Sequence, residues 1–176
     1  MTEIVNRVAN SPIVTIDLDK FYREGERVIF DLKPFLFQEM VLREKDYRQQ
    51  LKELDWTYYK DKFVAVTCSA DAIIPSWAYM LAMTYLKPVA AETILGDQVA
   101  LEQYLVSKSL QKINPEDFLD KPVVIKGCSK FPVTGFVYGE LMNLLMPFAR
   151  SIMYGEPCST VPIYKRAKPQ RDQGEE

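Results

Sequence analysis

The sequence repeats itself at an offset of about 59 residues, and this repeat limits the folds that are open to the chain. Residues 51–96 align with residues 110–155, and one inserted glycine, Gly127, places Cys68-Ser69 on Cys128-Ser129. The other identical pairs keep the same order in both copies. They are Leu51 and Leu110, Asp61 and Asp120, Lys62 and Lys121, Val64 and Val123, Tyr79 and Tyr138, Met83 and Met142, Leu86 and Leu145, Pro88 and Pro147, Ala90 and Ala149, and Gly96 and Gly155. We therefore expect a fold built from two copies of one strand-and-helix unit.

Short apolar runs alternate with longer segments of helical periodicity, which is typical of a mostly parallel sheet covered by helices. Strands are expected at 35–42, 63–67, 92–95, 122–126 and 150–154. Helices are expected at 44–54, 75–87, 97–112 and 134–146. The sequence thus predicts an α/β fold of three layers, in which a mostly parallel sheet carries helices on both faces and the duplication supplies both halves.

The length of 176 residues and the hydrophobic content of 48% suit one domain with a substantial core. We expect this single α/β domain to cover residues 1–166. Within it, residues 1–34 contain the strand-like runs VTIDL and RVIF, which could form an edge hairpin or an arm in a homodimer. Residues 167–176 are polar and are expected to form a disordered tail.

Two absences from the sequence exclude several kinds of chemistry. The chain has no histidine, so histidine bases, Cys-His pairs and histidine metal ligands are excluded. Its seven glycines form neither of the common phosphate-binding motifs.

Charge and hydrophobicity also limit the possible partners and location of the chain. The net charge is -2, and positive and negative residues alternate along the chain, which argues against nucleic-acid binding. Apolar runs are too short for a membrane span, and without an N-terminal signal pattern a cytoplasmic location is expected.

Three cysteines follow strand-like runs and form the main candidate site. Cys68 follows 63–67, Cys128 follows 122–126, and Cys158 follows 150–154. Open α/β sheets place their sites at the carboxyl ends of strands. Each cysteine is followed by a serine, Ser69, Ser129 or Ser159, which could donate a hydrogen bond to a ligand. We therefore expect the three thiols to lie at one edge of the sheet.

A cysteine at a strand-to-helix turn has its thiol pKa lowered by backbone N–H groups and by the helix dipole. Without histidine, an all-sulfur ligand set favours zinc or an iron-sulfur cluster over magnesium or calcium. Three protein ligands would leave one coordination position open to water or substrate. The leading hypothesis is therefore a metal site with Cys68, Cys128 and Cys158 as ligands. A fourth ligand could come from a nearby carboxylate, with Asp71, Asp97 and Glu156 as candidates.

Two further hypotheses fit the same three cysteines. Free cysteine is often a small buried hydrophobe, so all three thiols could be inert. In that case the chain would be a non-enzymatic interaction protein. Alternatively, one cysteine could be the nucleophile of a thiol enzyme or redox protein without metal, and another cysteine could resolve it. Lys126 and Lys130 flank Cys128 and could attract an anionic small molecule.

Several phrases of the sequence resemble an uncharacterised bacterial family described only as a domain of unknown function. These phrases are EIVNRVANS, TCSADAIIPSWAYM, VVIKGCSK and SIMYGEPCSTVPIYKR, and they extend over nearly the whole chain up to Arg166. The resemblance implies no established activity. A looser similarity links the three cysteines to quinolinate synthase, which also uses repeated α/β units and three cysteines to hold an open-site cluster. That similarity concerns only the logic of the site.

Overall fold

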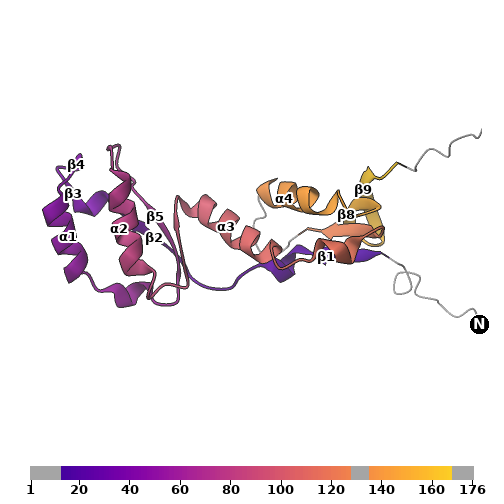
Figure 1. The fold of residues 1–176 in the computed structure, drawn as a ribbon, viewed down its shortest axis with the longest axis horizontal. Helices are drawn as coiled ribbons and strands as arrows, with labels where there is room; N and C mark the ends of the chain where they lie inside the picture. The colour runs from indigo at the N-terminus through magenta and orange to yellow at the C-terminus, as the bar shows by residue number, and fades with distance from the viewer. Residues whose placement is uncertain (1–12, 128–134, 168–176) are drawn as a thin grey trace, which may run out of the picture. The chain divides into compact units, whose positions relative to one another are not determined.

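The computed structural model describes residues 13–127 and 135–167. The described strands are β1 (Val14–Asp17), β2 (Arg27–Asp31), β3 (Leu36–Phe37), β4 (Val41–Leu42), β5 (Phe63–Thr67), β6 (Glu92–Leu95), β7 (Pro122–Lys126), β8 (Ser151–Glu156) and β9 (Ser159–Lys165). The α-helices are α1 (Glu44–Glu53), α2 (Ser76–Leu86), α3 (Gln98–Leu110) and α4 (Gly135–Leu145). Four short 3-10 helices, η1 (Leu18–Phe21), η2 (Lys33–Phe35), η3 (Trp56–Tyr59) and η4 (Pro115–Phe118), connect them. This is a mixed α/β fold, as the sequence predicted (Figure 1).

The chain folds into two compact units. Unit 2 is Arg23–Leu105, and unit 1 is described over residues 13–22, 106–127 and 135–167. Unit 2 contains a three-stranded sheet in the order β2-β5-β6, with both pairings parallel. Unit 1 contains a four-stranded sheet in the order β1-β7-β8-β9, in which only the β8–β9 pairing is antiparallel. The prediction of a mostly parallel sheet arrangement is therefore confirmed.

Unit 2 has a core rich in aromatic rings. Alternate residues of β2 and β5, such as Phe30 and Val64, pack against α1 and α2. The Tyr47 side chain of α1 is fully buried, and its hydroxyl donates a 3.0 Å hydrogen bond to the Ala78 carbonyl of α2. In a second cluster, Leu101 and Leu105 of α3 pack against strand residues whose side chains point to the opposite face of the sheet. Those strand residues are Phe63, Ala65 and Ile94.

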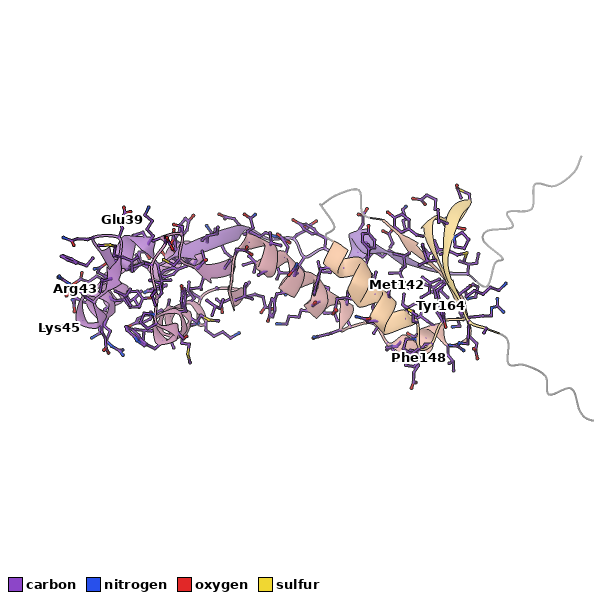
Figure 2. All side chains as sticks on the ribbon, turned by 90° about the horizontal axis from the view of Figure 1, so that it is seen from above. Glu39, Arg43, Lys45, Met142, Phe148 and Tyr164 are labelled. Carbon is purple, nitrogen blue, oxygen red and sulfur yellow. The ribbon has the colours of Figure 1, made fainter. Side chains whose placement is uncertain are left out.

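Unit 1 has a core of aliphatic side chains. Residues that alternate along β1, β7 and β8 pack against α4, the end of α3 and η4. Leu141 and Leu145 of α4 are fully buried in this cluster. Met142 of α4 and Tyr164 of β9 are partly buried and pack against this cluster at its edge (Figure 2). The continuous helix α3 thus contributes Leu101 and Leu105 to a cluster of unit 2 and Val106 and Leu110 to the core of unit 1.

The two units share local geometry at equivalent positions. The parallel partner of Phe63 is Glu92, and the partner of Pro122 is Ser151. Asp61 and Asp120 both have left-handed φ angles, 58° and 55°. Their backbone N–H groups each donate a 3.0 Å hydrogen bond, to the Val89 and Phe148 carbonyls respectively. The two units thus share the geometry of one turn and one parallel strand pair.

Several predictions differ from the structure. In place of one strand at 35–42, Phe35 ends η2 and residues 36–42 form a two-stranded hairpin, β3–β4, because Gln38 and Glu39 adopt left-handed φ angles and reverse the chain. The runs VTIDL and RVIF do not pair with each other; β1 pairs with β7 and β2 with β5, so the N-terminal hairpin is wrong. The described strands form separate sheets because the strands of each unit pair only with strands of the same unit. Strand β9 has no counterpart among the expected elements, since Pro162 interrupts its pattern.

The remaining expectations concern the single domain, the C-terminal tail and the absence of a membrane span. The division into units does not test the expected single domain over residues 1–166, because compact units can unfold together as one domain. Of the expected tail, residues 168–176 lie outside the described residues. Each helix in the described part of the chain falls short of the length and apolar character that a membrane span needs.

Candidate functional site

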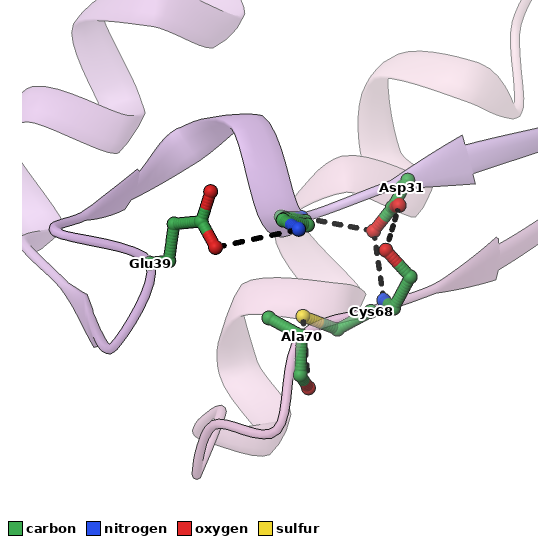
Figure 3. A network of polar contacts seen from close by, with 6 residues as sticks. Asp31, Glu39, Cys68 and Ala70 are labelled. Carbon is green, nitrogen blue, oxygen red and sulfur yellow. Dashed lines mark hydrogen bonds and ion pairs between the residues drawn. The ribbon is translucent and has the colours of Figure 1, made fainter.

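The candidate site of unit 2 lies at the carboxyl ends of β2 and β5. Asp31 is the last residue of β2, and Cys68 and Ser69 directly follow β5. The two strands are parallel, and Asp31 is the register partner of Thr67. Their ends therefore meet at one edge, which is where open α/β sheets bind ligands. Polar contacts link these residues with Lys33, Glu39 and Ala70. Figure 3 shows this network, with Asp31, Glu39, Cys68 and Ala70 labelled.

The Asp31 carboxylate is the centre of this network. It accepts hydrogen bonds from the Ser69 N–H at 2.9 Å, the Ser69 hydroxyl at 2.5 Å and the Lys33 N–H at 2.9 Å. Partial burial acts to raise the pKa of Asp31, but these hydrogen bonds and the charge of Lys33 outweigh it and lower the pKa. The Lys33 ammonium in turn pairs with Glu39 at 3.3 Å. Asp31 is therefore an ionised group that holds the Cys68-Ser69 turn against β2.

Cys68 is half-buried beside this network. Its thiol donates a weak 3.9 Å hydrogen bond to the Ala70 carbonyl, and its side chain packs against the aromatic core of unit 2. Tyr79, on the first turn of α2, interacts electrostatically with both Cys68 and Asp31. Burial and then the charges of these two groups raise the pKa of Tyr79. The tyrosine hydroxyl therefore stays protonated at neutral pH and can act as a hydrogen-bond donor.

Replacing Asp31 with asparagine is expected to flatten the dependence of stability on pH at the acid end. Because the pKa of Asp31 is lowered in the folded state, its contribution is complete above the unfolded pKa of about 3.9. That contribution is lost as the pH falls through the lower folded value. Urea unfolding of both proteins at a series of pH values would measure it. The difference in unfolding free energy should shrink from neutral pH toward the acid end, and a difference that is constant with pH would contradict this role.

The equivalent edge of unit 1 carries a different set of side chains. The Lys126 ammonium, at the end of β7, lies 3.3 Å from the Glu156 carboxylate at the end of β8. The hydrogen bond to Glu156 and the charge of that carboxylate raise the pKa of Lys126. Nearby, the rings of Tyr138 and Tyr154 meet edge to face with 5.7 Å between their centres. A Cβ atom on Gly127 would lie 2.7 Å from the Tyr154 hydroxyl, so a larger residue at this position would require the partly exposed Tyr154 side chain to shift.

A hollow of about 250 Å³ lies between α4 and the sheet of unit 1. Its lining is almost wholly apolar apart from the two tyrosines, and it consists of Ile125, Tyr138, Met142, Tyr154 and Ile163. The Tyr154 and Ile163 side chains are 40% and 53% exposed, so the hollow is open to solvent. Its apolar lining suits a small apolar group rather than an ion.

The structure brings together only part of the site expected from the sequence. Ser69 joins Cys68 in unit 2, whereas the exposed Cys158 lies in the β8–β9 turn of unit 1 and Ser159 begins β9. Cys128, Ser129 and Lys130 lie outside the described residues. Among residues 13–127 and 135–167, cysteine, aspartate and glutamate side chains form no group of three or more that could hold a metal ion. The zinc or iron-sulfur site is therefore unsupported by the described geometry.

Sequence reasoning missed Asp31, which contacts Ser69 most directly. A signal for it exists, because VTIDL and VIFDL are two versions of one pattern, with Asp17 and Asp31 at the same place. Both aspartates accept a hydrogen bond from the N–H two residues later, at 3.1 Å and 2.9 Å. An aspartate that ends a parallel strand and starts a tight turn is well placed to contact the end of the next strand.

Comparison with known proteins identifies the chain only at the level of its family. No curated protein and no solved structure matches it. A family model described as a protein of unknown function, DUF2480, matches residues 2–166 and so covers nearly all of the chain, including both units and the Cys68 site. The chain therefore belongs to the DUF2480 family of proteins of unknown function.

Proposed function

We propose that this chain is a thiol-dependent protein in which Cys68 is the reacting group. The observation that carries the proposal is the position of Cys68 at the carboxyl end of β5, half-buried and next to Asp31 and Tyr79. Half-burial gives a reagent access to the sulfur while the surrounding side chains restrict which reagent fits. Asp31 holds the following serine, so the turn that carries the thiol is fixed against β2.

The surrounding groups suit thiol-disulfide exchange better than proton-transfer catalysis. Asp31 has a lowered pKa and its oxygens already accept three hydrogen bonds, so it is a poor base. In the proposed step, Cys68 first loses its proton to solvent. Its thiolate then attacks one sulfur of a disulfide, the disulfide bond breaks, and the other sulfur leaves as a thiolate.

A chain with Cys128→Ser and Cys158→Ser tests the proposal, because Cys68 is then its only thiol. The folded double variant should form a mixed disulfide with an aromatic disulfide reagent, and the rate should rise with pH as the thiolate forms. A matched variant with Cys68→Ser and Cys158→Ser reports on Cys128 alone. If Cys68 reacts only as fast as the whole chain unfolds, the thiol is an inert core residue and the proposal fails. The chain would then be better described as a non-enzymatic interaction protein.

A zinc or iron-sulfur site with Cys68, Cys128 and Cys158 as ligands is the second candidate. Its support is that Cys68 and Cys158 each follow the carboxyl end of a parallel strand and precede a serine, as Cys128 does in the sequence. Elemental analysis and an absorption spectrum of protein purified without oxygen would test it. Stoichiometric metal that is lost in each single Cys→Ser variant would support this candidate over the first. Metal-free protein with a reactive Cys68 would support the first.

We further propose that the two units descend from a duplicated half, and that unit 2 is a three-layer arrangement. The shared strand register, the paired left-handed aspartates and the sequence repeat support the duplication. The two clusters on opposite sides of the β2-β5-β6 sheet support the layers. An experimental structure would test the duplication, because residues 61–96 and 120–155 should then superpose along their backbones, with one insertion at Gly127. Backbones that diverge outside the paired strands would contradict it.

A further inference from the structure

The outer edge of β6 is open in unit 2. The sheet order is β2-β5-β6, and no strand of the described part of the chain pairs with the far side of β6. An edge strand offers unpaired N–H and C=O groups that can accept another strand. In unit 1 the equivalent strand, β8, is covered on that side by the antiparallel strand β9. The equivalent edge thus accepts an antiparallel strand within the same molecule.

A hollow of about 260 Å³ lies directly beside this open edge. It is mostly apolar. Its lining consists of Met80, Met83 and Thr84 of α2, Lys87 just after this helix, and Thr93 of β6. Leu95, two residues after Thr93, points to the same face of the sheet and is 55% exposed. One edge therefore carries both an exposed apolar side chain and an apolar hollow that could receive one.

We propose that β6 pairs antiparallel with β6 of a second copy of this chain, which makes a homodimer with twofold symmetry. When the pairing is centred on Ile94, Thr93 of each copy lies opposite Leu95 of the other. Each Leu95 then covers the hollow beside Thr93 of the other copy, so the contact is self-complementary. The two three-stranded sheets join into one sheet across the symmetry axis.

Charge complementarity selects a second copy in this orientation. Lys87 lies in the turn between α2 and β6, and Asp97 lies two residues after β6; both are exposed. Neither has an ion pair within the part of the chain that the structure describes. An antiparallel pairing places Lys87 of each copy at the same end of the contact as Asp97 of the other, twice per dimer. A parallel pairing would instead bring like charges together, so these residues set the direction of pairing.

Sedimentation of the full chain over a wide range of concentration tests the dimer. A species of twice the 20.3 kDa chain mass is expected to form as concentration rises. Leu95→Lys should raise the dissociation constant by at least about tenfold, because the interface loses both of its Leu95 contacts, one from each copy. Leu119→Lys is the matched control, since Leu119 is also 55% exposed but lies in unit 1. A chain that stays monomeric at all concentrations, or a control that is equally disruptive, overturns the proposal.

Charge exchange provides a second test that a general loss of folding cannot imitate. Lys87→Glu and Asp97→Lys should each weaken the homodimer, because each places like charges together at both ends of the contact. A mixture of the two variants should form a heterodimer, because opposite charges then meet again in the contact. Asp97 also accepts a 2.8 Å hydrogen bond from the Ala100 N–H, so circular dichroism should verify that α3 remains folded. Two variants that stay monomeric when mixed, although each is folded, overturn this orientation.

Discussion

Replacing Leu145 with alanine is expected to lower the free energy of unfolding by about 2–5 kcal/mol. Leu145 is fully buried in the aliphatic core of unit 1, between α4 and the sheet, so the substitution leaves a cavity there. Met146→Ala is the control at the next position, because Met146 is 42% exposed. The control should change stability by about 0.5 kcal/mol or less. Urea unfolding monitored by circular dichroism would measure both values.

The same variant also tests whether the two units unfold together. The only tryptophans, Trp56 and Trp77, lie in unit 2, so their fluorescence reports on that unit alone. Helix α3 buries side chains in both units without a break, so loss of unit 1 should destabilise unit 2. We therefore expect Leu145→Ala to shift the fluorescence and circular dichroism transitions together. A fluorescence transition that stays at its wild-type position would show two independent domains.

Replacing Glu92 with alanine is expected to cost about 1–3 kcal/mol. Glu92 is buried in β6, where it pairs with the Arg23 guanidinium at 3.0 Å and accepts a 3.3 Å hydrogen bond from the Tyr104 hydroxyl. Arg23 also lies over the Phe63 ring. The substitution removes the carboxylate that neutralises a partly buried guanidinium. Because the Arg23 side chain is 30% exposed, the cost falls below that of a fully buried ion pair.

A surface ion pair provides the comparison for Glu92. Glu44 pairs with Arg48 one turn later on α1, and both side chains are at least half exposed. Glu44→Ala should therefore cost about 1 kcal/mol or less. Both variants should be measured at the same protein concentration, since β6 also forms the proposed dimer edge. Equal costs for the two substitutions would contradict the role assigned to Glu92.

Elements with a clear local pattern could be predicted closely from the sequence. The predicted strands 63–67, 92–95 and 122–126 coincide with β5, β6 and β7. They are short runs bounded by turns. β5 and β7 are apolar and almost wholly buried, whereas buried and more exposed residues alternate along β6, so the local residue pattern marks all three. The hairpin at 35–42 was missed because its turn residues, Gln38 and Glu39, seldom adopt left-handed φ angles. No local pattern indicates such a turn.

Only part of the candidate site could be predicted from the sequence. The position of Cys68 after β5 followed from the strand prediction, and the structure agrees. Its neighbours could not be predicted in the same way, because Asp31 comes from another strand and Tyr79 from a helix. Contacts between segments far apart in the chain depend on strand order, which periodicity does not encode.

The sequence by itself determined the α/β class, most element boundaries and the absence of histidine chemistry, because these depend on residue types and on contacts local in the chain. Only the tertiary structure decided that β1 pairs with β7 and β2 with β5, which gives each unit its own sheet. It also decided that Asp31 holds the Cys68-Ser69 turn and that the edge of β6 is open within the described residues. Local sequence does not determine strand order, because any apolar strand of suitable length can pair with several others. The choice between them is made by packing across the whole fold.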